Sequence, residues 1–370
     1  MVVLTVNTGS SSVRLALFAG EPTTDLRVCA EARYETDAAD PRERLTAFLD
    51  RHANDQRPRL AAHRVVHGGA RLTSARQIDA EVETEIERLA ALAPLHNPVA
   101  LAWIRACRAV LGADVPQVAV FDTAFYAHLP EVARAYALPH VLCERHGLRR
   151  YGFHGLAHQA LWSRWRALRP DLADGGKVVS FQLGAGCSVT AIDHGRPLDT
   201  SMGFSPLEGL VMATRSGDVD PGLVTFLQRV ESLNAADMER LLNEGSGLLG
   251  VSGTSGDLRA LLAADDPRAR LAIDLYCYRA RKYLGAYLAV LGGADAVLFG
   301  GGVGEHAAVV RTGILSGFAW AGLRLDAAAN PATVGREGRI SASDSGIEAW
   351  VIPVDEAPVL AAEALAAMAS

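Results

Sequence analysis

Two arginines of this sequence are placed where a guanidinium could bind an anion. Arg64 lies in the run HRVVHGG (63–69), after an apolar stretch, and Arg215 lies in TRSGD (214–218). An apolar strand that ends in Arg64 and is followed by Gly-Gly would place the guanidinium at the edge of a cleft. Arginine can hold a phosphate or a carboxylate through two parallel hydrogen bonds. The alternative for either residue is an ordinary surface ion pair.

Carboxylates and histidines add further chemistry. Asp122 follows the apolar run VAVF (118–121), and Glu356 follows VIPVD (351–355). Acidic residues at the ends of apolar strands often hold Mg²⁺, although either residue could instead cap a helix. His154, in RRYGFHG (149–155), could be catalytic, but a single histidine of this kind is more often structural.

Three turns rich in glycine and serine could bind phosphate through backbone N–H groups. They are NTGSSS (7–12), GAGCS (184–188) and GGGVGE (300–305). The first two lie between apolar strands and could be ordinary hairpin turns. The third follows a buried strand and precedes a helix, which favours a nucleotide site. The P-loop pattern and the protein-kinase motifs are both absent, so those two classes are excluded.

The elements that must position these residues alternate between strands and helices. Each of the first two turns is flanked by strands, at 2–6 with 13–18 and at 178–183 with 189–192. Two strand–turn–strand units at the starts of two halves suggest a duplicated architecture. Helical periodicity covers 80–93, 267–291 and 355–369, with Asp355 near the start of the last helix.

Composition limits the class of protein. The chain has 370 residues, enough for two domains, and is 49% hydrophobic and 21% charged. Its net charge of −6 argues against non-specific binding to nucleic acid or to anionic membranes. The five cysteines form no C-x-x-C pair and predict reduced thiols. The polar turn that begins at Asn7 is not the pattern expected of a signal peptide, and no apolar run reaches about 18 residues. These features predict a cytoplasmic α/β protein with no membrane or nucleic-acid partner.

A series of motifs resembles the acetate kinase family of the sugar-kinase, heat-shock-70 and actin-like superfamily. The resemblance runs from Val3 to about Ala361. Its segments occur in the family's order: NTGSSS (7–12), HRVVHGG (63–69), LAPLHNP (92–98), FDTAF (121–125), YGFHG (151–155), DTSMGFSPLEG (199–209), TRSGDVDP (214–221), GLLGVSG (247–253) and IPVDE (352–356).

The resemblance implies an α/β fold with a two-domain, duplicated ribonuclease-H-like core and an interdomain active-site cleft. Residues 1–149 with 357–370 would form the N-terminal acetokinase domain, and 150–356 the C-terminal nucleotide-binding and dimerisation domain. The implied activity is reversible phosphoryl transfer between ATP and acetate, giving acetyl phosphate and ADP. The phosphoryl group would pass directly and in line from donor to acceptor, with Mg²⁺ or Mn²⁺ as the metal ion. The resemblance also implies that the protein forms a homodimer. A carboxylate oxygen is already a nucleophile, so positioning and charge stabilisation would supply the catalysis.

Residue roles follow from the same resemblance. Asn7 and Glu356 are similar to the metal-site residues, and Arg64 and Arg215 to the pair that grips the carboxyl and phosphoryl groups. His154 resembles the donor to the phosphoryl group, and Asp122 the carboxylate that orients these groups. The pocket for the substrate's methyl group would consist of Val66, Leu95, Phe153 and Pro206. The nucleotide-binding residues would be Arg14, Gln182, Gly184, Gly186, Asp257, Leu258, Arg259, Gly302 and Gly304.

The sequence departs from the family mostly on the phosphoryl-donor side. Arg14 stands where the family usually has Lys, Gln182 where it has His, and Ala185 and His306 where it has Asn. Glutamine can still donate a hydrogen bond, whereas alanine cannot. The chain is also somewhat short for the family. These departures leave open a donor other than ATP, such as another nucleotide or pyrophosphate, and a catalytically weakened nucleotide sensor. A propionate or butyrate kinase is the near alternative, although Val66 favours acetate.

Overall fold

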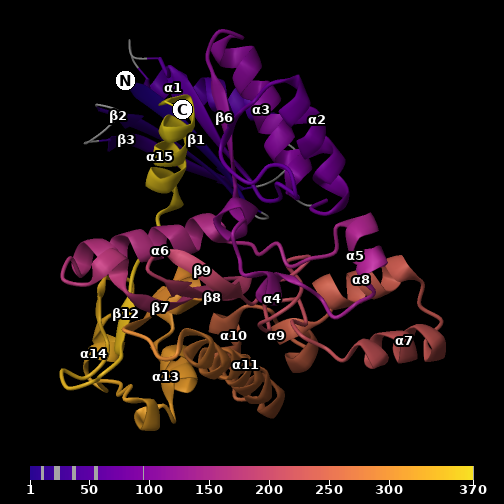
Figure 1. The fold of residues 1–370 in the computed structure, drawn as a ribbon, viewed down its shortest axis with the longest axis vertical. Helices are drawn as coiled ribbons and strands as arrows, with labels where there is room; N and C mark the ends of the chain where they lie inside the picture. Colours follow the sequence, from indigo (N-terminus) through magenta and orange to yellow (C-terminus); the bar gives the residue numbers. More distant parts are fainter. Residues whose placement is uncertain (10–11, 21–25, 36–38, 54–56, 95, 370) are drawn as a thin grey trace. The chain divides into compact units, whose positions relative to one another are not determined.

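Two mixed sheets with flanking helices organise the chain (Figure 1). The computed structural model describes residues 1–9, 12–20, 26–35, 39–53, 57–94 and 96–369. Its contacts divide the chain into two compact units. The first unit consists of Met1–Ala127, Phe153–Leu156 and Asp355–Ser370, and the second of His128–Gly152 and Ala157–Val354. Among the described residues, no helix is long and apolar enough to cross a membrane.

The sheet of the first unit has the strand order β3-β2-β1-β4-β6-β5. The strands β1, β2 and β3 are antiparallel neighbours, β1, β4 and β6 are parallel, and the short β5 is antiparallel to β6. The bounds are β1 Val2–Thr8, β2 Ser12–Ala19, β3 Arg27–Glu35, β4 Leu60–Val65, β5 Arg76–Gln77 and β6 Gln117–Phe121. Ser10 and Ser11 of the first glycine-serine turn lie outside the described residues.

Helices bury both faces of this sheet. The last helix, α15 (Glu356–Ala369), presents apolar residues at helical spacing to one face, where they pack with strand residues. The opposite face is covered by α1 (Pro41–His52) and α3 (Asn97–Leu111). Helix α2 (Ala80–Arg88) continues as a 3₁₀ turn over Leu89–Ala91. Because β1 is buried on both faces, apolar residues occupy both faces of the strand over residues 2–6, with Thr5 the one polar residue of that stretch.

The sheet of the second unit repeats the pattern of the first. Its order is β11-β12-β10-β7-β8-β9, with β7, β8 and β9 antiparallel, β7, β10 and β12 parallel, and a short antiparallel edge strand. The bounds are β7 Lys177–Leu183, β8 Cys187–Asp193, β9 Arg196–Thr200, β10 Ala296–Gly300, β11 Gly338–Arg339 and β12 Glu348–Val351. Equal strand order and pairing in both sheets confirm the duplicated α/β architecture predicted from the two turns.

The second unit carries most of the helices. Their bounds are α4 Glu131–Arg134, α5 His140–His146, α6 Gly155–Leu168, α7 Pro221–Val230, α8 Ala235–Glu244, α9 Gly247–Ser252, α10 Leu258–Ala263, α11 Pro267–Leu291, α12 Gly301–His306, α13 Ala308–Leu315 and α14 Ala329–Ala332. Helix α11 has the bounds predicted from periodicity. Asp266 caps its start, Pro267 occupies its first turn, and Gly292 ends it in the left-handed conformation.

Two fully buried histidines are held in the neutral form. His158 of α6 places Nδ1 2.9 Å from Ser180 Oγ and Nε2 2.8 Å from Ser188 Oγ, and burial lowers its pKa to about 3. His63 of β4 contacts Gln117, and burial lowers its pKa to about 4. The folded chain therefore leaves both rings unprotonated at pH values where the unfolded chain protonates them.

This difference predicts that acid destabilises the fold. Between pH 6.5 and 4 the unfolded state binds protons at these histidines and the folded state does not. The free energy of unfolding should therefore fall by about 1.4 kcal/mol per pH unit for each histidine. Urea unfolding at a series of pH values measures this slope. His158→Gln should reduce the slope of unfolding free energy against pH by the contribution of one histidine. His128→Gln, at an exposed position, should leave this slope unchanged. An unchanged slope in His158→Gln would contradict the assignment.

Candidate functional site

Four predicted site residues of the first unit meet at one edge of its sheet. Asn7 lies near the end of β1, Arg64 near the end of β4, and Asp122 directly after β6. These three strands are parallel, so their carboxyl ends share one edge, where ligand sites of open α/β sheets lie. Glu356, the first residue of α15, reaches the same place from the far end of the chain.

Arg64 is the centre of this cluster. Its Nη2 donates to Asp122 Oδ2 at 2.7 Å and its Nε to Asp122 Oδ1 at 3.1 Å, which is a bidentate ion pair. Its Nη1 donates to Asn7 Oδ1 at 3.1 Å and to Glu356 Oε2 at 3.2 Å. Asn7 Nδ2 donates to the same Glu356 oxygen at 2.6 Å. The guanidinium is therefore fixed in direction by three partners.

Burial and charge determine the protonation of this cluster. The side chains of Arg64, Asp122 and Glu356 are 11%, 1% and 13% exposed. Burial acts to lower the pKa of Arg64, but the carboxylates of Asp122 and Glu356 outweigh it and the pKa is raised. Burial raises the pKa of Asp122, and the Arg64 guanidinium opposes that change. Arg64 thus stays a cation whose charge is offset by two carboxylates.

The chemistry of Asn7 and Glu356 fits a magnesium ion held together with substrate. They offer an amide oxygen and a carboxylate, which are hard ligands, and they lie in hydrogen-bond contact with each other. Mg²⁺ commonly uses one or two protein oxygens and completes its shell with water and substrate phosphates. Among the described residues, no three His, Cys, Asp or Glu side chains form a closed metal cage. The pair therefore suits an ion that arrives with phosphate.

The backbone that carries His154 passes close to Asp122 of this cluster. A Cβ atom at the following residue, Gly155, would come within 2.0 Å of the Asp122 carbonyl oxygen, so glycine is needed for this approach. His154 has a φ of 58°, a left-handed conformation that costs free energy in a non-glycine residue and often marks a functional position. Phe153 is buried, and its carbonyl oxygen accepts a hydrogen bond from Tyr126 at 3.0 Å.

The other predicted site residues of the first unit are Val66, Leu95 and Arg14, and their surroundings differ from one another. Val66 is buried, as a wall of an apolar pocket must be. Leu95 lies outside the described residues. Arg14, on β2, forms ion pairs with Glu31 and with Asp355, the latter at 3.2 Å. Its charge is therefore already offset by two carboxylates in this structure.

A cavity of about 890 Å³ in the second unit contains much of the predicted nucleotide set. Its volume is within the range of small-molecule and cofactor sites. Predicted residues in its lining are Gly184, Asp257, Leu258, Arg259 and Gly302. The lining also includes Ala185 and His306, two of the positions where the sequence departs from the family on the donor side. Sequence reasoning did not assign the remaining lining residues, which are Ala213, Thr214, Leu248, Gly256, Leu262, Tyr276, Val303 and Ala307. Their nearness in sequence to the recognised motifs was a signal for most of them, but Tyr276, inside α11, had none.

Three predicted nucleotide residues support this cavity without lining it. Gly186 closes the turn, because its carbonyl oxygen accepts from Gly184 N at 3.0 Å. Gly304 packs on the backbone of Phe299. Gln182 places its amide against Gly301, where a Cβ atom would come within 2.8 Å of Nε2. The Oε1 atom of Gln182 is buried and has no hydrogen-bond partner in the part of the chain that the structure describes.

Arg215 is the second predicted arginine, and its surroundings differ from those of Arg64. Its Nη1 donates to the carbonyl oxygen of Pro206 at 3.2 Å and contacts Met212 Sδ at 3.6 Å, so two predicted residues meet here. Within the described ranges it forms no ion pair, and burial lowers its pKa. A partly buried guanidinium without a carboxylate is suited to binding an anion.

Comparisons with known proteins are consistent with this geometry. The model of the acetokinase family matches residues 31–362. The acetate kinase of Solibacter usitatus is 50% identical over 303 residues, which span 81% of this chain and 73% of that protein. The crystal structure of Porphyromonas gingivalis acetate kinase is 36% identical and superposes with a TM-score of 0.89 over 99% of both chains. A propionate kinase from Francisella tularensis is 33% identical, with a TM-score of 0.86 over 98% of both chains.

Proposed function

Because this chain belongs to the acetokinase family, we propose that it transfers a phosphoryl group reversibly between ATP and acetate, giving acetyl phosphate and ADP. It is a phosphotransferase with a carboxyl group as acceptor. The observation that carries the proposal is the Arg64 cluster, in which one arginine is fixed by Asn7, Asp122 and Glu356 at the carboxyl ends of parallel strands.

The site residues have two kinds of role in this reaction, binding of the substrates and stabilisation of charge. A carboxylate oxygen of acetate attacks the γ-phosphorus and the bond to ADP breaks, so no proton has to be removed from the nucleophile. Arg215 and Arg64 bind the carboxyl group and the phosphoryl oxygens, and His154 donates to the phosphoryl group in transfer. Asp122 holds Arg64 in direction. Asn7 and Glu356 would hold Mg²⁺, which would offset phosphate charge. Val66, Leu95, Phe153 and Pro206 would surround the methyl group.

The cavity of the second unit supports a nucleotide as the phosphoryl donor. Apolar side chains form much of its wall, including Leu248, Leu258 and Leu262. Pyrophosphate has no apolar part that could displace water from such a wall, whereas a nucleoside has one. The wall therefore favours a nucleotide over pyrophosphate, and among nucleotides we propose ATP, which membership of the acetokinase family implies, despite the altered turn residues. We propose propionate as a second acceptor, because one extra methylene changes binding by only about 1–3 kcal/mol.

A coupled assay of acyl phosphate formation tests the function. Purified protein is given acetate, propionate or butyrate with Mg²⁺ and, in separate wells, ATP, GTP or pyrophosphate. Turnover with ATP and acetate supports the proposal. Turnover only with another donor would support the carboxyl group as the acceptor and would overturn the assignment of ATP as the donor. No turnover from folded protein with any pair would overturn the kinase function in favour of a nucleotide sensor.

Ala185 provides a prediction about the donor side. Its position in the turn after β7 lines the cavity, and alanine offers no side-chain hydrogen bond. Ala185→Asn should add a donor toward the phosphates and raise kcat/KM for ATP about tenfold, as expected for one hydrogen bond to a charged group. The KM for acetate should stay unchanged. Steady-state kinetics with each substrate varied in turn measures this, and an unchanged or lower kcat/KM for ATP would contradict it.

Two further properties implied by the family stay predictions. We propose a homodimer, with the region of α11 as the predicted interface, and a cytoplasmic location. Sedimentation equilibrium of the purified chain tests the first, since a monomer at micromolar concentration would contradict it.

A further inference from the structure

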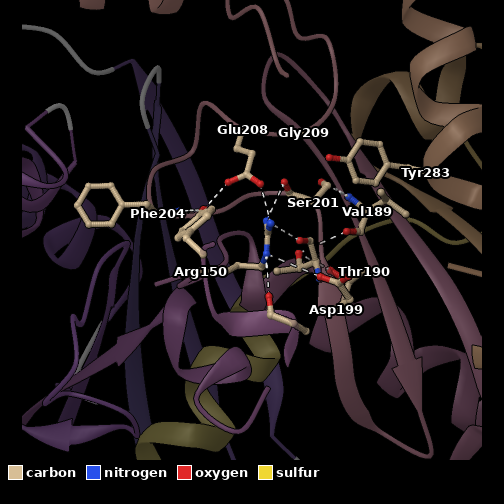
Figure 2. A network of polar contacts seen from close by, with 12 residues as sticks. Arg150, Val189, Thr190, Asp199, Ser201, Phe204, Glu208, Gly209 and Tyr283 are labelled. Atoms are coloured by element: carbon tan, nitrogen blue, oxygen red, sulfur yellow. Dashed lines mark hydrogen bonds and ion pairs between the residues drawn. The ribbon is translucent and has the colours of Figure 1, made fainter. Parts of the chain in front are cut away.

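A polar network in the second unit is not explained by the roles assigned above. Figure 2 shows Arg150 among the backbone of residues 199–201 and the carboxylate of Glu208. Strand β9 ends at Thr200, and residues 201–220 connect it to α7. The part of this connection from 201 to 218, called the loop below, carries both Pro206 and Arg215. We propose that Arg150 is a positioning residue that holds this loop and thereby sets the place of Arg215 and Pro206. The inference rests on the proposed function.

Arg150 uses its whole guanidinium fork for this purpose. Nη1 donates to the carbonyl oxygens of Thr200 and Ser201 at 3.0 and 3.3 Å, and Nη2 donates to Glu208 Oε1 at 2.6 Å. Nε donates to the carbonyl oxygen of Ala133 at 3.2 Å. One side chain therefore connects the first residue of the loop to its middle and anchors both on a separate segment of the unit.

Tyr136 completes the same contact. Its hydroxyl group donates to Glu208 Oε2 and accepts from the backbone N–H of Phe204 at 2.8 Å. The loop lies so close that a Cβ atom at Gly203 would clash with both the Tyr136 hydroxyl and Glu208. The backbone N–H groups of Tyr151 and Gly152 donate to the Gly203 carbonyl oxygen at 3.0 and 3.3 Å. The first half of the loop is thus fixed from several directions.

The second half of the loop is held both by the first half and by neighbouring helices of the unit. Asp218 accepts from Gly209 N at 2.7 Å and from the Tyr283 hydroxyl at 2.8 Å, and it pairs with Arg279 at 3.2 Å. Arg215 lies in this half, and its Nη1 donates to the Pro206 carbonyl oxygen of the first half at 3.2 Å. The backbone around Arg215 is also held from α8 and α9, because Ser216 N donates to the Leu242 carbonyl oxygen at 3.0 Å and Leu248 N donates to that of Met212 at 2.9 Å. We therefore expect Arg150 to act on the Arg215 guanidinium through Pro206 in the first half.

Lysine cannot replace Arg150 in this role. The acceptors lie around a planar fork, and one ammonium group cannot reach the carbonyl oxygens of Ala133 and Thr200 and the Glu208 carboxylate together. The Arg150 side chain is 16% exposed and that of Glu208 is 30% exposed, so solvent does not readily replace the lost contacts.

The test measures the kinetics of Arg150→Lys, Arg150→Ala and Tyr136→Phe. Displacing a positioned group by about 1 Å can cost about 100-fold, so we expect Arg150→Ala to lower kcat about 30- to 100-fold and to raise the KM for acetate about tenfold. The KM for ATP should change less than about twofold. Arg150→Lys should resemble Arg150→Ala, and added guanidinium ion should restore part of the Arg150→Ala activity. Tyr136→Phe should shift the same parameters by about threefold.

Arg164 offers a matched control in the same unit. It pairs with the carboxylate of Glu337 through hydrogen bonds of 2.6 and 2.8 Å, its partner lies outside the loop, and its side chain is 52% exposed. Arg164→Ala should leave every kinetic parameter unchanged. Wild-type kinetics for folded Arg150→Ala, or equal increases in both KM values, would overturn the proposal.

Hydrogen exchange of the substrate-free protein keeps this test separate from the proposed function. Arg150→Ala should speed amide exchange within residues 201–218 and leave the β7–β10 core unchanged. If the wild-type protein has no kinase activity, the proposed function fails while this readout still decides whether Arg150 holds the loop. Unchanged exchange in the loop, or faster exchange throughout the unit, would overturn the proposal.

Discussion

Replacing Arg215 with alanine should lower kcat by about 10³-fold and leave the free energy of unfolding unchanged or slightly higher. The rate should fall because this guanidinium is proposed to stabilise charge on the transferring phosphoryl group. Stability should not fall, because Arg215 has no carboxylate partner among the described residues and burial already disfavours its charge. Removing it leaves no buried carboxylate unpaired.

Steady-state kinetics and urea unfolding of the same preparations measure both effects. Arg215→Lys is the matched variant, since it keeps the positive charge but cannot form the two parallel hydrogen bonds of a guanidinium group. We expect its kcat to lie between those of the wild-type and alanine proteins. Near-normal turnover in folded Arg215→Ala would remove Arg215 from the active site, and a large loss of stability would show that an undetected partner depends on it.

Replacing Arg64 with alanine should lower kcat comparably, by about 10³-fold, and also destabilise the fold by about 3–5 kcal/mol. The second effect arises because Asp122 and Glu356, with side chains 1% and 13% exposed, would lose the cation that offsets their charge. The double variant Arg64→Ala/Asp122→Asn should recover much of the stability and none of the activity. This pairing separates the catalytic contribution of Arg64 from its structural one.

The instability of Arg64→Ala should depend on pH in a definite direction. Without the guanidinium, the pKa of Asp122 in the folded state rises further, because burial and the neighbouring Glu356 already raise it. A carboxyl group with a raised folded pKa contributes stability that is present at low pH and lost as the pH rises through that pKa. The stability difference between Arg64→Ala and wild type should therefore be smaller at pH 5 than at pH 7. An equal difference at both pH values would mean that the cluster's charges are not coupled.

The two arginine variants together test more than either one alone. A sequence-based view treats Arg64 and Arg215 as an equivalent pair, each with a large effect on rate and a small one on stability. The structure assigns a stability cost to Arg64 alone. If both variants kept wild-type stability, the Arg64 cluster would be looser than its hydrogen bonds indicate.

The sequence by itself determined the fold class and named the four residues that the structure brings together at the edge of the first sheet. Strand–turn–strand patterns at the starts of two halves predicted the duplicated sheets, and the bounds of α11 followed from its helical periodicity. Asn7, Arg64 and Asp122 could be placed near strand ends because side-chain types that bind anions and metals interrupt apolar runs there. Such signals are local, so a linear pattern can carry them.

Only the tertiary structure decided which of these residues are partners. Asn7 and Glu356 are 349 positions apart, and Arg64 and Glu356 are 292 apart, yet each pair is in hydrogen-bond contact. The same is true of Arg14 with Asp355, and of Arg150 with Glu208. Contacts of this kind depend on strand order and on where a returning helix begins, and neither follows from periodicity. Since the charge that each arginine can offer to a substrate depends on those partners, the sequence named the cations, and the packing of distant segments determined which one is left to bind an anion.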